Sequence, residues 1–95
     1  MDKLKIEKLV KKNGIRSQSI EVQKKCEELI QAISKCMHPK TMLPIIERER
    51  LMEKMADIMI CLEQLQIMYY IDDEELYAIK QYKEKRLIER EGLKE

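Results

Sequence analysis

The stretch that decides the fold is residues 45–70, which read IIERERLMEKMADIMICLEQLQIMYY. Apolar side chains recur in it at alternating intervals of four and three residues, at Leu51, Met55, Ile58, Leu62, Leu65 and Tyr69. A second apolar row widens this face and contains Met52, Ala56, Met59 and Ile60. The spacing predicts an α-helix. Because a helix that is apolar almost all round needs neighbours on every side, we expect a second subunit to cover part of it.

Working outward from this stretch, we expect four helices, over residues 2–12, 17–37, 45–70 and 72–90. Asn13-Gly14 is a strong helix terminator, and Pro39 ends the second helix because the residue before a proline avoids helical geometry. Asp72 with Glu75 three residues later has the form of a capping box. The sequence therefore predicts a single all-α domain, 1–95, folded as an antiparallel helical bundle of about four helices.

Length and composition narrow the function. The chain has 95 residues, with 19 basic and 18 acidic side chains and a formal net charge of +1. So small a domain gains stability by oligomerising, which favours a homo-oligomer, either a dimer or a tetramer. Near-neutral charge argues against specific DNA binding. Without an apolar run of roughly 20 residues or a signal peptide, no membrane is expected, and we predict a cytoplasmic protein.

The cysteines do not form a recognisable metal or disulfide pattern. Cys26, Cys36 and Cys61 are odd in number, contain no C-x-x-C pair and, with His38, make no zinc signature. We interpret them as buried reduced thiols, since a free cysteine behaves as a small apolar residue. His38 is interpreted as an ordinary residue of a loop over 38–44.

Two carboxylates stand among apolar neighbours and need partners. Asp57 lies between Ala56 and Ile58, and Glu28 precedes Leu29. A desolvated carboxylate without a partner costs several kcal/mol, so each should be paired, metal-bound or protonated. A salt bridge to a lysine of a neighbouring helix and a metal or phosphate site both satisfy this requirement, and the sequence leaves both open.

Three strings resemble one protein family. Residues 26–35, CEELIQAISK, look like the second helix of small MazG-like all-α NTP pyrophosphohydrolases, and residues 51–60, LMEKMADIMI, look like their third. Residues 83–87, KEKRL, resemble the basic segment near their C-terminus. The resemblance extends over about residues 13–88. The short stand-alone forms of this family often come from bacteriophages, which would place this protein in the host cytoplasm.

The chain departs from the family at the metal site. In the family, E-x-x-E on one helix and E-x-x-D on the next hold magnesium against substrate phosphates. These positions fall here on Lys25 and Glu28, then on Lys54 and Asp57. The expected charge thereby changes from −4 to 0, which removes both ligands and the field that holds magnesium. We therefore expect no cofactor, and absent or very weak hydrolysis.

The leading hypothesis is a non-catalytic nucleotide-binding protein, a pseudoenzyme in which lysines take the place of the metal. It would sequester a phosphorylated nucleotide or nucleotide signal, and in a phage it would act as a counter-defence sponge. A compact lysine charge suits phosphate. The candidate ligand-binding residues are Lys25, Glu28, Lys54, Asp57, Lys83 and Arg86.

Two alternatives belong to other classes. The first is a magnesium-dependent pyrophosphohydrolase with an altered metal site formed by Glu27, Glu28, Glu53 and Asp57. The second is a structural helical oligomer in which the lysines and carboxylates form ordinary salt bridges.

Overall fold

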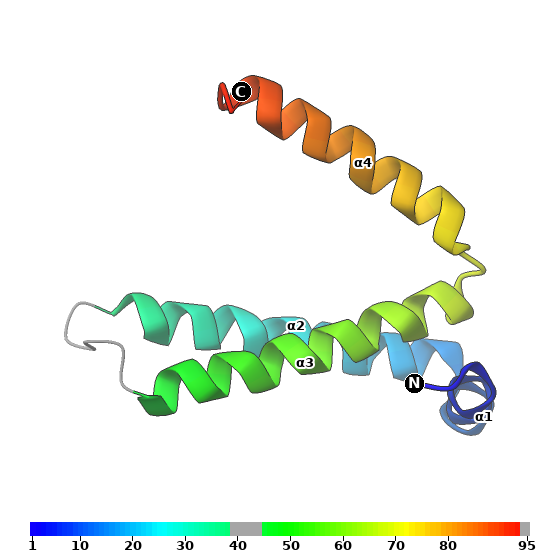
Figure 1. Ribbon diagram of the computed structural model, residues 1–95. Coiled ribbons are helices and arrows are strands. Elements are labelled where there is room, and N and C mark those ends of the chain that lie inside the picture. Colours follow the sequence, from blue (N-terminus) through cyan, green and yellow to red (C-terminus); the bar gives the residue numbers. More distant parts are fainter. Residues whose placement is uncertain (39–44, 94–95) are drawn as a thin grey trace.

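The structure, a computed structural model, describes residues 1–38 and 45–93 (Figure 1). This part of the chain contains helices and no strand, which confirms the all-α prediction. The helices are α1 (Lys3–Asn13), α2 (Ile15–Met37), α3 (Ile45–Met68) and α4 (Asp73–Arg90). The predicted loop over 38–44 lies, apart from His38, outside the described residues.

The first two helices are joined more tightly than predicted. The Asp2 side chain accepts a hydrogen bond of 3.0 Å from the Leu4 N–H and so caps α1. Gly14, with φ of +85°, ends α1, and α2 begins at the very next residue instead of at residue 17. Glycine reaches this φ without steric cost, so one residue is enough to turn the chain. Ser17, where the helix was predicted to begin, therefore lies inside the first turn of α2.

Helices α2 and α3 form a long antiparallel hairpin, and α1 crosses one end of it (Figure 1). The core of the hairpin contains Val22 of α2 with Cys61 and Met68 of α3. Ile6 of α1, only 1% exposed, is the most completely buried large side chain among the described residues. The face of α3 that packs is therefore not the whole of the predicted row, because Met55 and Leu62 of that row are each 51% exposed while Cys61 and Met68, outside it, are buried.

Helix α3 ends at Met68, two residues before the predicted boundary. Tyr70 has a φ of +56°, and the Ile71 N–H donates a 2.8 Å hydrogen bond to the Gln66 carbonyl. This is the Schellman arrangement that closes many helices. The Gln66 side chain also donates to the Ile71 carbonyl at 3.4 Å and to the Asp73 carboxylate at 2.8 Å. Side chain and backbone together fix the direction in which the chain leaves α3.

Helix α4 extends away from the hairpin instead of packing along it (Figure 1). Asp72 caps it as predicted, accepting a 2.7 Å hydrogen bond from the Glu75 N–H. Over residues 73–90 no side chain is buried against the rest of the described chain. None of the described helices is both long enough and apolar enough to cross a membrane. The single chain is therefore a helical hairpin with a crossing helix and a projecting one.

Candidate functional site

The structure brings four of the six predicted ligand-binding residues together, two from each hairpin helix. Lys54 of α3 donates a 3.1 Å hydrogen bond to the Glu28 carboxylate of α2. Lys25 Nζ lies 3.6 Å from Glu28 and 3.9 Å from the Asp57 carboxylate across the interface. The result is a chain of alternating charges, Asp57–Lys25–Glu28–Lys54, which we call the ion cluster.

The ion cluster is half-buried and electrically neutral. Its side chains are between 26% and 40% exposed, so water reaches all of them. The hydrogen bond from Lys54, aided by the positive charge of Lys25, lowers the pKa of Glu28, and this outweighs the opposing effect of burial. Both carboxylates singled out in the sequence are thus paired with lysines. Of the two alternatives left open by the sequence, the single chain therefore shows the salt bridge to a lysine.

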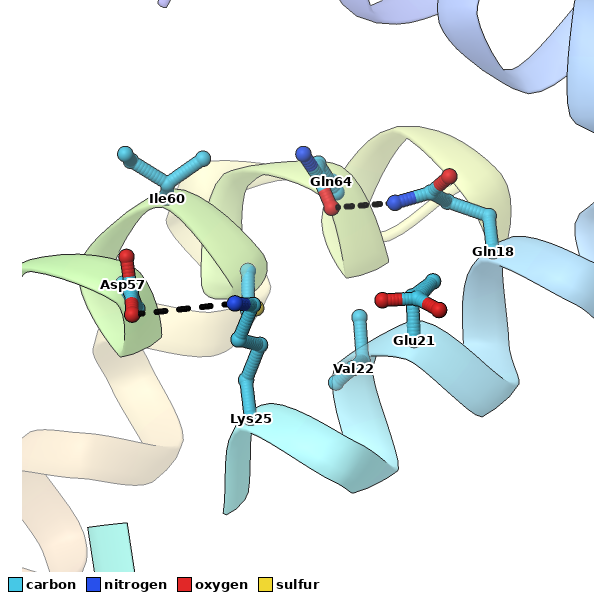
Figure 2. Close-up of a pocket in the computed structure, with 8 residues that line it drawn as sticks. Gln18, Glu21, Val22, Lys25, Asp57, Ile60 and Gln64 are labelled. Carbon is cyan, nitrogen blue, oxygen red and sulfur yellow. Dashed lines mark hydrogen bonds and ion pairs between the residues drawn. The ribbon is translucent and has the colours of Figure 1, made fainter. Parts of the chain in front are cut away.

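A shallow groove opens beside Lys25. It has a volume of about 130 Å³, and its walls combine the side chains Gln18, Glu21, Val22, Lys25, Asp57, Ile60, Cys61 and Gln64. Figure 2 shows Lys25 rising from α2 to reach Asp57 on α3, with Ile60 pointing away from α2. The groove is smaller than a typical ligand pocket. It can admit a phosphate-sized group, while the remainder of a nucleotide would lie outside it.

A buried polar contact at one end of this groove was missed by the sequence reasoning. Gln18 Nε2 donates a 3.0 Å hydrogen bond to Gln64 Oε1, and both side chains are buried (Figure 2). Asn13 Nδ2 donates to Gln18 Oε1 at 3.3 Å. A signal for both glutamines existed, because Gln18 precedes Val22 by four residues and Gln64 follows Cys61 by three. Each therefore lies on the buried row of its helix.

The other two predicted ligand-binding residues, Lys83 and Arg86, lie on α4 and apart from the ion cluster in the single chain (Figure 1). The Arg86 guanidinium stands 5.8 Å from the centre of the Tyr82 ring, a cation–π distance. Their proposed place beside the same ligand would need α4 of another copy, because the turn after α3 directs α4 away from its own hairpin.

The residues do not fit a magnesium site. Within residues 1–38 and 45–93, no three acidic, histidine or cysteine side chains gather closely enough to hold a metal ion. Glu27 and Glu53, the two residues that the enzyme hypothesis adds to the site, are exposed on their helices. The remaining carboxylates, Glu28 and Asp57, already pair with lysines. No catalytic step through a metal follows from this arrangement.

The cysteines differ from one another, which corrects the prediction that all three are buried. Only Cys61 is buried, whereas Cys36 is partly buried and Cys26 is exposed. Burial raises the pKa of the Cys61 thiol, and the nearby Cys26 and Asp57 raise it further. Cys26 therefore lies near the interface, where it influences the Cys61 thiol, while its own side chain is exposed.

Comparison of the chain with protein-family models, with curated proteins and with solved structures finds no match. The MazG-like resemblance therefore rests on the three strings of sequence alone. The function has to be inferred from the ion cluster, the groove and the apolar surfaces of the helices.

Proposed function

We propose that this protein is a non-catalytic, homo-oligomeric binder that sequesters a phosphorylated nucleotide, with Lys25 as its phosphate-contacting group. The observation that carries the proposal is the loose pairing of Lys25. Its two ion-pair distances, 3.6 and 3.9 Å, are both longer than a hydrogen bond between charged groups, which measures about 2.7–2.9 Å. A phosphate oxygen at hydrogen-bond distance would improve on both contacts.

The position of Lys25 suits this role. Its side chain is 37% exposed and forms part of the groove wall, so an anion can reach the ammonium group without unfolding either helix. Lys54, by contrast, is paired with Glu28 at 3.1 Å. It neutralises this carboxylate, which would otherwise attract Lys25 more strongly. The two lysines thus have different tasks: Lys25 meets the phosphate, and Lys54 neutralises Glu28.

The residues of the ion cluster do not suit a magnesium ion, and this supports binding without hydrolysis. Cleavage of a triphosphate in water needs its charge neutralised and an attacking hydroxide generated, tasks that a bound metal ordinarily performs. Lysine supplies the charge but no activated water. A protein of this kind would act stoichiometrically, one ligand per site.

A direct test is native purification followed by mass spectrometry of bound nucleotides, and calorimetry with a panel of mono-, di-, tri- and cyclic nucleotides. Lys25→Ala should weaken binding by roughly ten- to a hundredfold, the worth of one charge-assisted contact. Lys24→Ala is the matched control. It removes the neighbouring lysine, which pairs with Glu21 at 3.4 Å and lies outside the groove wall.

Equal losses in both variants would mean that general positive charge, and not the groove, attracts the nucleotide. No binding by the wild-type protein to any nucleotide would overturn the proposal. In that case the protein would be the structural helical oligomer considered above, since every charge of the ion cluster already has a partner of opposite sign within the chain.

The homo-oligomeric part of the proposal rests on a separate observation. Large apolar side chains on α2 and α3 remain exposed, among them Ile30 at 63% and Met59 at 67%. So many exposed large apolar side chains on a short chain favour a protein interface. Sedimentation at micromolar concentration should give a mass of at least twice 11.4 kDa. A stable monomer would contradict this part alone.

A further inference from the structure

Two rows of exposed apolar side chains run along the hairpin. On α3 they alternate by three, four and three residues, at Met52, Met55, Met59 and Leu62. On α2 they alternate by four, three and four, at Cys26, Ile30, Ile33 and Met37. Intervals of three and four keep side chains on one stripe of a helix and are typical of the contact rows in helical bundles. Neither row is the one that holds α2 against α3.

Both rows lie on the same side of the hairpin. On α2, Ile33 follows the buried Ala32 by one residue, and on α3, Leu62 follows the buried Cys61 by one residue. One residue is a rotation of about 100°, and in antiparallel helices equal rotations from the shared interface lead to the same side.

A hydrogen bond supports this placement independently. Ser19 lies one heptad before Cys26, and Tyr69 lies one heptad after Leu62, so they continue the two rows. The Ser19 and Tyr69 hydroxyl oxygens are 2.7 Å apart. The rows therefore meet across the hairpin and form a single surface, which we call the apolar face.

The groove lies on the opposite side of the hairpin. Glu21 and Ile60, two of its lining residues, come one residue before the buried Val22 and Cys61. They are therefore rotated in the opposite sense from the apolar face. A partner bound to the apolar face would leave the groove open.

The chain's own α4 cannot cover the apolar face without breaking the turn after α3. That turn is fixed by the Ile71 to Gln66 backbone hydrogen bond and by the 2.8 Å bond from Gln66 to Asp73. The cover must come from another molecule. Seven of the large side chains on the face, each 43–75% exposed, present on the order of 700 Å², close to the roughly 800 Å² that each partner gives to a stable interface.

We propose that the apolar face is the subunit interface and that its occupant is the same face of a second copy of this chain. Two hairpins packed face to face complete a four-helix core in which the alternating rows interdigitate. The two ion clusters and their grooves remain on the outer surfaces of the dimer. This inference rests on the homo-oligomer proposed above and adds which surface forms it.

The test places a lysine on each of three surfaces and measures the oligomeric state by sedimentation equilibrium. Ile30→Lys and Met55→Lys lie on the apolar face, on different helices. Ile60→Lys, on the groove side, and Ile79→Lys, on α4, are matched controls, since their side chains are 40% and 55% exposed. Circular dichroism checks that each variant keeps the helical content of the wild type.

We expect Ile30→Lys and Met55→Lys each to weaken association by about a hundredfold or more, because two unpaired ammonium groups would enter an apolar interface. The two control variants should associate like the wild type. Dissociation in Ile60→Lys or Ile79→Lys, with none in the apolar-face variants, would overturn this inference while leaving the homo-oligomer intact. A monomeric wild type would overturn both. Loss of helix in Met55→Lys leaves Ile30→Lys to decide the result.

Discussion

Lys54 on α3 donates a 3.1 Å hydrogen bond to Glu28 on α2, and this contact ties the two long helices together near their middles. A carboxylate at position 54 would repel Glu28, whereas the ammonium group of Lys54 attracts it. The hydrogen bond is also the largest cause of the lowered pKa of Glu28.

The first prediction concerns acid. Because the folded-state pKa of Glu28 is below its ordinary value of 4.5, the ion pair stabilises the fold above that pH, and the stabilisation is lost as pH falls through the lowered pKa. Lys54→Met should therefore be less stable than the wild type at pH 7, and the difference should shrink as the pH falls below 4.5 and through the lowered pKa. Urea unfolding at several pH values measures it. Lys24→Met, which affects only an exposed pair, should show a smaller difference, and equal differences would contradict the assignment.

The second prediction concerns Gln18 and Gln64. Gln64→Leu removes the acceptor at 3.0 Å and leaves a buried amide without its partner, which should cost about 1–3 kcal/mol in free energy of unfolding. In the double variant Gln18→Leu/Gln64→Leu, two apolar side chains face each other, and much of that loss should be recovered. Urea unfolding of the wild type, both single variants and the double variant gives the interaction free energy of the two side chains by a double-mutant cycle. Strictly additive losses would show that the two amides do not interact.

The third prediction concerns thiol reactivity. Cys26 is exposed, whereas Cys61 is buried with a raised pKa, so less of it is thiolate at any pH near neutrality. Iodoacetamide at pH 8 should label Cys26 much faster than Cys61, as peptide mass spectrometry would record. In urea the two rates should converge. Formation of the proposed dimer should slow the labelling of Cys26, because that residue lies on the apolar face.

The fourth prediction concerns the turn between α3 and α4. Tyr70 adopts a φ of +56° while its side chain is 92% exposed, so the turn gains little from the ring and bears the steric cost of a left-handed residue. Tyr70→Gly should raise the free energy of unfolding by up to about 1 kcal/mol. Tyr70→Ala is the control, because alanine loses the ring and keeps the steric conflict. A gain in the alanine variant as large as in the glycine variant would point to the ring instead.

Much of the fold was determined by the sequence alone, because it depends on contacts between residues close along the chain. The intervals in residues 45–70 decide that the segment is helical, whatever it packs against. Asp72 caps α4 through a hydrogen bond to a residue three positions away, and Gly14 ends α1 through its own backbone. The MazG-like resemblance led us to consider Lys25, Glu28, Lys54 and Asp57 together, and the three-residue spacing of each pair puts it on one helix face.

Only the tertiary structure decided which charges meet and which surfaces stay uncovered. That Lys54 holds Glu28 while Lys25 approaches Asp57 depends on how far each helix is rotated about its axis, and a shift of one residue, about 100°, would separate them. The direction of α4 was likewise set by the turn at Tyr70, a positive φ that a tyrosine adopts when the surrounding hydrogen bonds require it. Packing angles and turn geometry of this kind arise from interactions distributed over several elements, and no local pattern in the sequence encodes them.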